Sequence, residues 1–424
     1  MMPNEYLKIA EQVGKHKTVQ NLMRHINKET LYQQHKSQLK KKAPGVDGVT
    51  KEEYSRSLDT NLESLVERMK RFSYRPQPVK RVYIAKIASD KLRPLGLPSY
   101  EDKLVQGVMA NILSVIYEPK FLNLSYGFRP GRSCHQAILD LDNKIMHEPV
   151  NYIVDADIHG FFDNVNHDWL IKFLEHDIED KNFIRYIKKF LKSGIMEQGK
   201  LIESDKGTPQ GGLISPILAN VYLHYVLDLW FEKVVKKDCY YASMVRYADD
   251  FVCCFKLENE AKRFLVMLKA RLAKFGLEIA EDKTKIIKFG RFQKSTKVTF
   301  DFLGFTHING VTRNGHYKLI HHTSSKKLKA KMQSAKEWLN DHRHEKPAEI
   351  IAKLNVKLIG HYRYYGISDN HNKLRRFQNY CRRQLYVALN SRSQKKLTWE
   401  KYLKILKYNP IAEPKIYVST WKGK

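Results

Sequence analysis

The sequence of 424 residues predicts an α+β fold with an antiparallel sheet, followed by an all-α, strongly basic region. Three observations lead to this fold class. From residue 82 onward, short β-like runs alternate with amphipathic helical patterns. After residue 325 only helical patterns follow. The net charge is +30, and residues 321–424 hold 24 Lys and Arg against 7 Asp and Glu.

The elements are expected in the following order. Residues 5–40 are polar and permit a helix, and turn signals at 43–49 lead into a second charged helix that ends near residue 71. Apolar runs predict strands at 82–84, 152–154 and 298–300 and a hairpin around Asp249. Amphipathic patterns predict helices near 100–117, 168–192, 216–232 and 259–275. Residues 306–325 contain Gly310 and Gly315 and few apolar residues in register, so we expect a connector there, followed by basic helices at 326–340, 348–365 and 371–391.

The composition narrows the class of protein. Apolar residues make up 42% of the chain, which is enough for a sizeable core. The excess of positive charge indicates a polyanion partner, most often nucleic acid, although an anionic membrane surface has the same sign. No run of about 18 apolar residues could span a bilayer, and the first residues form no signal peptide, so we expect a soluble intracellular protein. The five cysteines lack C-x-x-C spacing, which predicts reduced thiols.

Two acidic clusters are candidates for a metal site. Asp249 and Asp250 lie at the turn of an apolar hairpin, and Asp155 and Asp157 follow a predicted strand. Neighbouring carboxylates that are partly desolvated cost free energy unless a cation neutralises them, and hard oxygen ligands suit Mg²⁺. Two acidic segments of this kind suit two Mg²⁺ ions in phosphoryl transfer. Ordinary turn chemistry is the alternative for an isolated Asp pair.

Three motifs in order carry a resemblance to a known family. They are Asp157-Ile158-His159-Gly160-Phe161-Phe162-Asp163, then Gly207-Thr208-Pro209-Gln210-Gly211-Gly212-Leu213-Ile214-Ser215-Pro216, then Tyr247-Ala248-Asp249-Asp250. Together they resemble reverse transcriptases, and the second is typical of those encoded within group II introns. The segments 44–48, 93–98, 125–133, 283–285 and 302–305 resemble the fingers and palm of that family, and 354–365 is similar to the start of its thumb or maturase domain.

The resemblance implies a right-hand polymerase. Residues 1–80 would form an N-terminal helical extension and the start of the fingers, 81–305 the fingers and palm, 306–325 the connector, and 326–424 a helical thumb or maturase (X) domain. The implied reaction is RNA-directed DNA synthesis from a primer 3′-hydroxyl with dNTPs and two Mg²⁺ ions, for which Mn²⁺ could substitute. The family's longer members continue into an H-N-H endonuclease domain, which we do not expect here.

The family also implies partners and a biological role. The partners would be a structured intron RNA, an RNA template–DNA primer duplex, dNTPs and a target DNA, in the bacterial cytoplasm with the nucleoid or an RNA–protein particle. The role would include splicing and retrohoming. An RNA-binding splicing factor with incidental or lost polymerase activity is one alternative, and a free-standing cellular reverse transcriptase in repair or defence is another. An RNA-templated RNA polymerase is disfavoured by Ala248 and by the segment around Gln210.

Catalytic roles carry over residue by residue. The implied metal ligands are Asp157, Asp249 and Asp250. Asp155 departs from the family pattern, and we expect it to act as a supporting charge. Lys283 matches a lysine placed to protonate the pyrophosphate leaving group.

Substrate roles carry over in the same way. Lys86 and Arg93 resemble fingers cations that grip the triphosphate, with a generic basic face as the alternative. Phe162 matches the bulky residue that excludes a ribose 2′-hydroxyl, with a core aromatic as its alternative. The segment Gln210-Gly211-Gly212 would approach the nascent base pair closely, because two of its three residues lack a Cβ atom. Arginines expected to bind nucleic acid are Arg129, Arg132, Arg363, Arg375, Arg376, Arg382 and Arg383.

Overall fold

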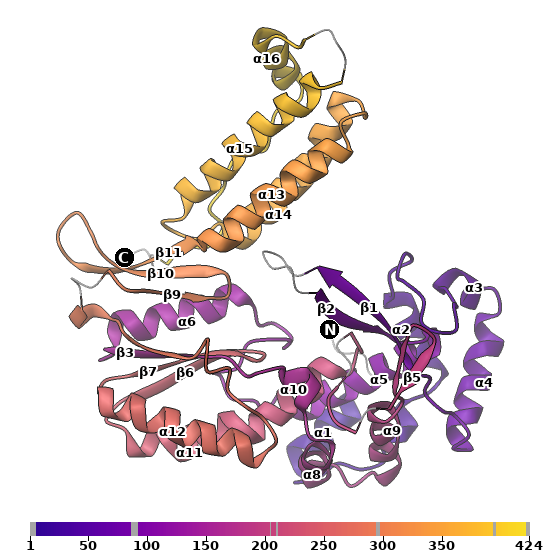
Figure 1. Cartoon of the computed structure of the whole chain (residues 1–424). Coiled ribbons are helices and arrows are strands. Elements are labelled where there is room, and N and C mark those ends of the chain that lie inside the picture. The colour runs from indigo at the N-terminus through magenta and orange to yellow at the C-terminus, as the bar shows by residue number, and fades with distance from the viewer. Residues whose placement is uncertain are drawn as a thin grey trace. The chain divides into compact units, whose positions relative to one another are not determined.

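A computed structural model describes residues 6–85, 92–203, 205–208, 211–293, 297–392 and 396–420 (Figure 1). The chain forms two compact units. The first unit comprises Met1–Ala85, Leu92–Ala137 and Val154–Ile286, and the second contains Ile138–Ile153 and Ile287–Lys424. In the described part of the chain, no helix is long and apolar enough to cross a lipid bilayer.

The first unit opens with helices, as its N-terminal pattern predicts: α1 (Leu7–Lys15), α2 (Lys28–Ser37), α3 (Lys51–Ser55) and α4 (Leu58–Lys70). Capping boxes start two of them, since Asn27 pairs with Thr30 before α2 and Thr50 pairs with Glu53 before α3. Helices α1 and α2 pack against α5 (Tyr100–Tyr117), which is buried along most of its length. The predicted helix at 100–117 is thereby confirmed.

A sheet in the order β2-β1-β4-β5 follows. Strands β1 (Val79–Ala85) and β2 (Leu92–Leu97) are antiparallel, and their register places Ile84 opposite Arg93. The short strands β4 (Ile195–Glu197) and β5 (Lys200–Ile202) extend this sheet.

A second sheet has the order β6-β7-β3-β8 and supports the acidic residues. Its strands are β3 (Tyr152–Ala156), β6 (Ala242–Tyr247), β7 (Asp250–Phe255) and β8 (Lys285–Lys288). Helices α11 (Leu229–Lys233) and α12 (Glu258–Lys274) lie on one face of it (Figure 1), where the rings of Phe255 and Phe264 are 5.1 Å apart. The predicted helix at 216–232 is one run of α10 (Ser215–Leu223), a π-helical turn at His224–Asp228, and α11.

The helix predicted at 168–192 is divided in two, α8 (His167–Asp177) and α9 (Lys181–Leu191). The Asp180 carboxylate accepts hydrogen bonds from the backbone N–H groups of Asn182 and Phe183, both at 3.0 Å, and so begins a new helix. The apolar period continues across the break, which is why the sequence pattern does not show it.

The second unit contains strands where we predicted a connector. Residues 306–325 form most of a hairpin of β10 (Phe305–Val311) and β11 (Tyr317–Thr323), which β9 (Thr299–Phe302) joins in the order β11-β10-β9. The apolar alternation is weak because His307 and His321 occupy fully buried positions, where their Nδ1 atoms are 3.0 Å apart. Nε2 of His321 is 2.8 Å from Oδ1 of Asp142 on α6 (Cys134–His147), so both ring nitrogens of His321 have polar partners, whereas Nε2 of His307 has none among the described residues.

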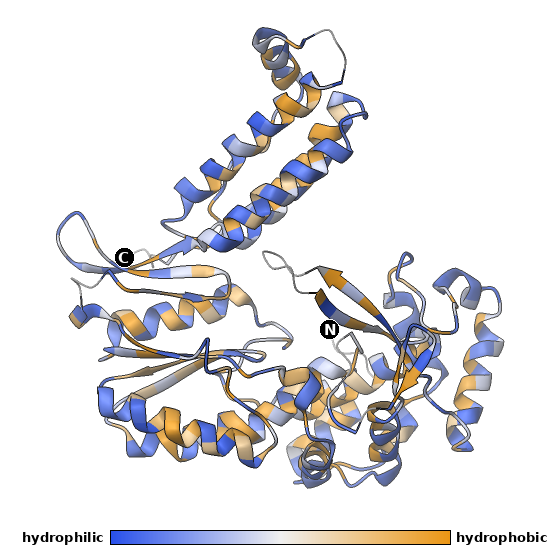
Figure 2. Ribbon diagram, in the orientation of Figure 1, coloured by the Kyte–Doolittle hydropathy of each residue, from blue (hydrophilic) through white to orange (hydrophobic). Residues whose placement is uncertain are grey.

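The basic helices predicted after residue 325 are confirmed. They are α13 (Ser325–Asp341), α14 (Pro347–Tyr365) and α15 (His371–Asn390), and α16 (Trp399–Tyr408) follows them. Hydrophobic and hydrophilic residues alternate along each helix (Figure 2), and the hydrophobic ones form a common core that includes Leu354, Leu358, Phe377, Leu385 and Tyr402.

Candidate active site

The turn between β6 and β7 carries two of the three predicted metal ligands. Tyr247 pairs with Asp250 across the hairpin, so Ala248 and Asp249 form a two-residue loop. Ala248 has a φ of 58°, in the left-handed region that tight hairpin turns require. Asp249 is half-buried at the turn, and Asp250 is exposed at the start of β7.

Asp157 follows β3, the strand that neighbours β7 in the sheet. Its backbone carbonyl accepts a hydrogen bond from the N–H of Ala280 at 2.8 Å, which fixes the turn that carries Lys283. Nζ of Lys283 lies 2.5 Å from Oδ2 of Asp157, although the lysine side chain is 62% exposed. Two residues that are far apart in the sequence, and for which we predicted catalytic roles, therefore form an ion pair.

Electrostatics couple these residues. Burial raises the pKa of Asp249, and the nearby charge of Asp157 raises it further, against the opposing charges of Arg93 and Arg246. The hydrogen bond to Asp157 raises the pKa of Lys283, and the charges of Asp282 and Asp250 act in the same direction. Asp157, Asp249, Asp250 and Lys283 thus lie within electrostatic reach as one cluster.

The oxygen donors of this cluster fit a divalent cation. The charge of Asp157 opposes the ionisation of Asp249, and a bound cation would relieve that repulsion. Among the described residues, no three His, Cys, Asp or Glu side chains stand ready as a metal-binding group. In this structure the cation that contacts Asp157 is the ammonium group of Lys283.

A fully buried network fixes the turn from below. Nη1 of Arg246 donates to the carbonyl oxygen of Ala248 at 2.9 Å and to Oδ1 of Asn220 at 3.1 Å. The same guanidinium forms an ion pair with Asp228 through Nη2 and Oδ2 at 2.5 Å. The sequence analysis missed these three residues, although an arginine within an apolar strand and an acid within an apolar helix signal a buried pair.

The predicted triphosphate site is described in part. Arg93 is exposed on β2, and its charge reaches Asp249. Lys86 and Gln210 lie outside the described residues. Gly211 has a φ of 114°, and a Cβ atom there would lie only 2.3 Å from the carbonyl oxygen of Gly96. Gly211 therefore packs closely against β2, and Gly212 is buried, while the predicted approach of this segment to a base pair stays a prediction.

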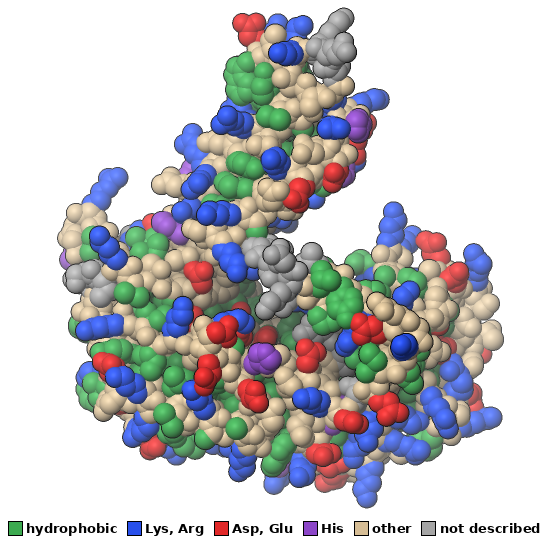
Figure 3. Space-filling model, viewed as in Figure 1, with side chains coloured by type: hydrophobic (Ala, Val, Ile, Leu, Met, Phe, Trp, Pro, Cys, Tyr) green, Lys and Arg blue, Asp and Glu red, His purple; other side chains and the backbone are tan. Residues whose placement is uncertain are grey.

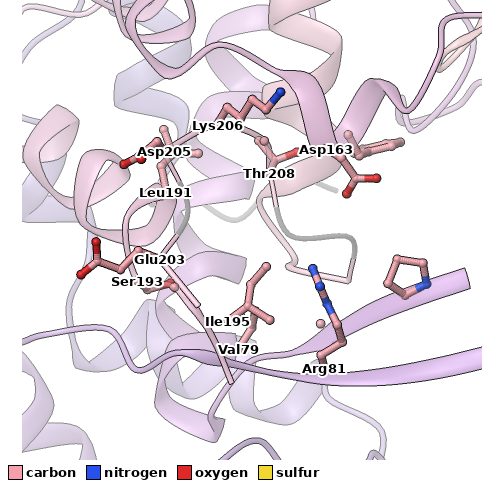
Figure 4. Close-up of a pocket in the computed structure, with 15 residues that line it drawn as sticks. Val79, Arg81, Asp163, Leu191, Ser193, Ile195, Glu203, Asp205, Lys206 and Thr208 are labelled. Atoms are coloured by element: carbon pink, nitrogen blue, oxygen red, sulfur yellow. The ribbon is translucent and has the colours of Figure 1, made fainter. Parts of the chain in front are cut away.

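Phe162 borders a cavity. It lies on α7 (Phe161–Asn164), and the centroids of the Phe161 and Phe162 rings are 5.3 Å apart. Phe161 is buried in the core, whereas Phe162 is half-buried. The cavity of about 410 Å³ is also lined by Arg81, Gly96 and Thr208 (Figure 4). Phe162 therefore lies beside this cavity and is not fully buried in the core, and its substrate role stays a prediction.

The predicted nucleic-acid arginines differ in their surroundings. Arg129 is 6% exposed, and its guanidinium donates to Glu118 and to the carbonyl oxygens of Leu122 and Ser125 at 2.7 Å, so the prediction that it contacts nucleic acid is wrong. Arg382 is half-buried. Arg132 is half-buried as well, and its Nη2 donates to Oδ1 of Asn123 at 2.7 Å. The exposed members are Arg363, Arg375, Arg376 and Arg383. Lys and Arg side chains recur along the visible face of α13–α16 (Figure 3).

Comparisons with known proteins agree with this geometry. Residues 84–307 match the family described as reverse transcriptase (RNA-dependent DNA polymerase). The chain is 38% identical over 229 residues to the group II intron-encoded protein LtrA of Lactococcus lactis subsp. cremoris, which covers 54% of the chain and 36% of LtrA. It is 31% identical over 311 residues to protein YkfC of Escherichia coli (65% of the chain and 79% of YkfC). It is 26% identical over 179 residues to nuclear intron maturase 2 of Arabidopsis thaliana (32% of the chain and 24% of the maturase).

The family match takes in the two acidic segments, the segment 207–216 and more than half of the chain, although the chain spans only about a third of the length of LtrA. The matched region contains the three motifs on which the resemblance rests, and also the strands β3, β6 and β7 that carry the acidic residues. The chain belongs to the reverse transcriptase (RNA-dependent DNA polymerase) family, alongside its group II intron-encoded members.

Proposed function

We propose that the chain is an RNA-directed DNA polymerase, which extends a primer 3′-hydroxyl with dNTPs on an RNA template. The observation that carries the proposal is a charged cluster beside two neighbouring strands. In it, Lys283 forms an ion pair with Asp157, and the charge of Asp157 acts on Asp249. An acidic cluster with a partner cation suits phosphoryl transfer, in which positioning and charge supply most of the catalysis.

The resident metal would be Mg²⁺, as two ions held by Asp157, Asp249 and Asp250, with Mn²⁺ as a substitute. When bound, it would activate the 3′-hydroxyl and neutralise charge on the phosphates. The Arg246 network holds the backbone of the turn that carries Asp249 before any substrate arrives. The protein therefore fixes the position of the turn that would present Asp249 to the metal.

Other side chains would handle the nucleotide. Lys283, whose pKa is raised by its contact with Asp157, keeps a proton on Nζ that it can donate to the leaving pyrophosphate. Arg93 is exposed and would grip the triphosphate. Phe162 beside the cavity would exclude a ribose 2′-hydroxyl.

The proposed partners are RNA and the template–primer duplex. The names of LtrA and of nuclear intron maturase 2 support binding of an intron RNA and help with splicing. Retrohoming at a target DNA, in a bacterial cytoplasm, is proposed from the family resemblance alone. The exposed arginines on α14 and α15 would contact the RNA backbone. They would serve an RNA-binding splicing factor equally well, which keeps that second function open.

Primer extension on an RNA template tests the polymerase. With Mg²⁺ and dNTPs we expect DNA product, and with rNTPs almost none. The Asp249→Asn variant should lose at least about 100-fold in rate, because a carboxylate that is proposed to bind the metal is removed. Its RNA affinity, measured by fluorescence anisotropy, should stay within about 2-fold of the wild type.

Glu281→Gln is the matched control, since Glu281 is an exposed carboxylate near Lys283 that pairs with Lys269 at 2.6 Å. It should extend the primer as the wild type does. Synthesis retained by Asp249→Asn would contradict the assigned site. Tight RNA binding by a wild type that makes no product would favour the splicing factor.

A further inference from the structure

We infer that Phe128 contacts nucleic acid beside the catalytic turn, with its ring packed against a base or sugar of the template–primer duplex. The inference rests on the proposed polymerase function and adds a substrate contact to it. It starts from two properties of this residue. The Phe128 side chain is 55% exposed, and its backbone has a φ of 57°, in the left-handed region.

Both properties are unfavourable for phenylalanine. Left-handed backbone costs free energy for a residue with a side chain, whereas glycine adopts it readily. An exposed ring also gains little from burial. Strained residues persist where the surroundings fix the backbone, and they cluster at functional sites. Glycine would satisfy the backbone at this position, so the fold alone does not require the ring.

The residue before Phe128 is fixed to the catalytic turn. A Cβ atom on Gly127 would lie 2.3 Å from the backbone nitrogen of Ala248, so the two backbones are in direct contact. Nδ2 of Asn220 donates to the carbonyl oxygen of Gly127 at 2.7 Å, and Asn220 is 1% exposed. The N–H of Tyr126 donates to the carbonyl oxygen of Arg246 at 2.8 Å. Phe128 therefore begins one residue away from the turn that holds Asp249.

The residue after Phe128 is fixed as firmly. Arg129 is buried, and its guanidinium bonds to Glu118 and to two backbone carbonyl oxygens of the same loop. The loop is therefore held on both sides of Phe128. This is why an arginine that we expected at the nucleic-acid surface lies inside the fold. Arg129 holds the loop that carries Phe128.

The position of Phe128 selects the ligand. A primer 3′-hydroxyl must reach Asp157 and Asp249 for synthesis, so the last base pairs of the duplex must pass beside the turn. Aromatic side chains stack on bases without sequence preference, as a polymerase requires. Arg132, half-buried four residues further along the chain, can supply a cation for the adjacent phosphate. We therefore assign the ring to the duplex rather than to the incoming nucleotide.

Binding of a labelled RNA template–DNA primer duplex tests this assignment. The full chain is titrated by fluorescence anisotropy with Mg²⁺ and without dNTPs, so no synthesis is needed. Phe128→Gly should raise the dissociation constant about 10-fold, within the range measured for stacked bases. Its melting temperature should equal or exceed that of the wild type, because the backbone strain is removed. Phe128→Tyr should restore wild-type affinity.

Phe72 provides a matched control. It is also a phenylalanine with a φ of 57°, it is 37% exposed, and it follows α4, in a different part of the sequence from the turn. Phe72→Gly should relieve strain in the same way and leave duplex affinity within about 2-fold of the wild type. Equal affinity losses in the two glycine variants would overturn the inference.

Three other results would also overturn it. They are wild-type affinity in Phe128→Gly, failure of Phe128→Tyr to restore binding, and a rise confined to the KM for dNTP. Failure of the polymerase proposal is recognised separately, since primer extension by the wild-type chain does not depend on Phe128 variants.

Discussion

Arg246 and Asp228 form an ion pair that is wholly inaccessible to solvent, and this pair lies directly under the residues proposed for catalysis. Removing one partner of such a pair leaves an uncompensated buried charge and costs about 3–5 kcal/mol. The guanidinium also bonds to the Ala248 carbonyl, so the pair links stability to the shape of the turn. Residues that touch no substrate therefore set the position of Asp249.

A second buried acid gives the protein a specific pH dependence. Asp102 is 2% exposed, and burial raises its pKa to about 7, although Tyr74 and the Gln77 N–H donate hydrogen bonds to it. The folded-state pKa lies above the value of 3.8 for an unperturbed carboxyl group. The folded protein therefore binds the proton more tightly, and stability falls as pH rises from about 4 to about 7, by roughly 4 kcal/mol at most.

We expect the Asp102→Asn variant to lose this pH dependence. Asparagine cannot ionise, yet its side-chain oxygen can accept from Gln77 and its amide can donate to the Tyr74 oxygen. Melting temperatures measured at intervals between pH 4.5 and 7.5 should decline less steeply for the variant than for the wild type. Parallel declines in both proteins would show that Asp102 is not the responsible group.

The sequence predicts some of these residues and not others, for a physical reason. Asp157, Asp249 and Lys283 belong to motifs that a sequence shows directly, and the ion pair between Asp157 and Lys283 brings two of these motifs together, while their catalytic roles stay predictions. Arg129 sits in a similar motif, but only tertiary structure shows that Glu118 and two carbonyl oxygens use its guanidinium. A basic side chain looks the same in a sequence whether it faces phosphate or a buried acid.

Elements were predicted best where the apolar pattern alone determines them. Helix α5 was predicted with its observed bounds, because apolar residues recur at helical spacing throughout its length. The β10–β11 hairpin was not predicted, because its interior contains His307 and His321 instead of apolar residues. The break between α8 and α9 was missed for the opposite reason, since the apolar period continues while a single cap changes the chain direction.

The contribution of the Asp180 cap to stability can be tested. Besides starting α9, the Asp180 carboxylate accepts the backbone N–H groups of Leu22 at 2.6 Å and Met23 at 3.1 Å. Asp180→Ala should therefore lower the free energy of unfolding by about 2–4 kcal/mol, because four backbone donors lose their acceptor. Urea titration of the full chain measures the difference.

Asp168→Ala is the control for this change. Asp168 lies in the first turn of α8, whose cap is supplied by Asn166. Its removal should cost about 0.5 kcal/mol or less. Equal destabilisation by the two variants would indicate that Asp180 contributes only as a first-turn charge and that its hydrogen bonds matter little.

At the scale of the whole molecule, net charge was the most dependable prediction about partners. Charge is a sum over residues and needs no knowledge of contacts. Its location on the surface does need that knowledge, as the buried Arg129 and the half-buried Arg382 show. The net charge of +30 cannot identify which side chains contact phosphate. Exposure in the structure identifies the arginines of α15 as candidates.

Salt dependence of RNA binding distinguishes local contacts from total charge. Each phosphate contact contributes about 0.7–0.9 to the slope of log K against log salt concentration, because bound counterions are released. Exchanging Arg375 and Arg376 for Gln should therefore reduce the slope by roughly 1.4–1.8 if both contact phosphate. The matched control exchanges Lys236 and Lys262 for Gln, two exposed lysines paired with Glu232 and Glu258 in the first unit. It removes the same charge and should leave the slope nearly unchanged. Equal changes in both variants would mean that binding follows the net charge of the molecule, and that the α15 arginines have no special contact with RNA.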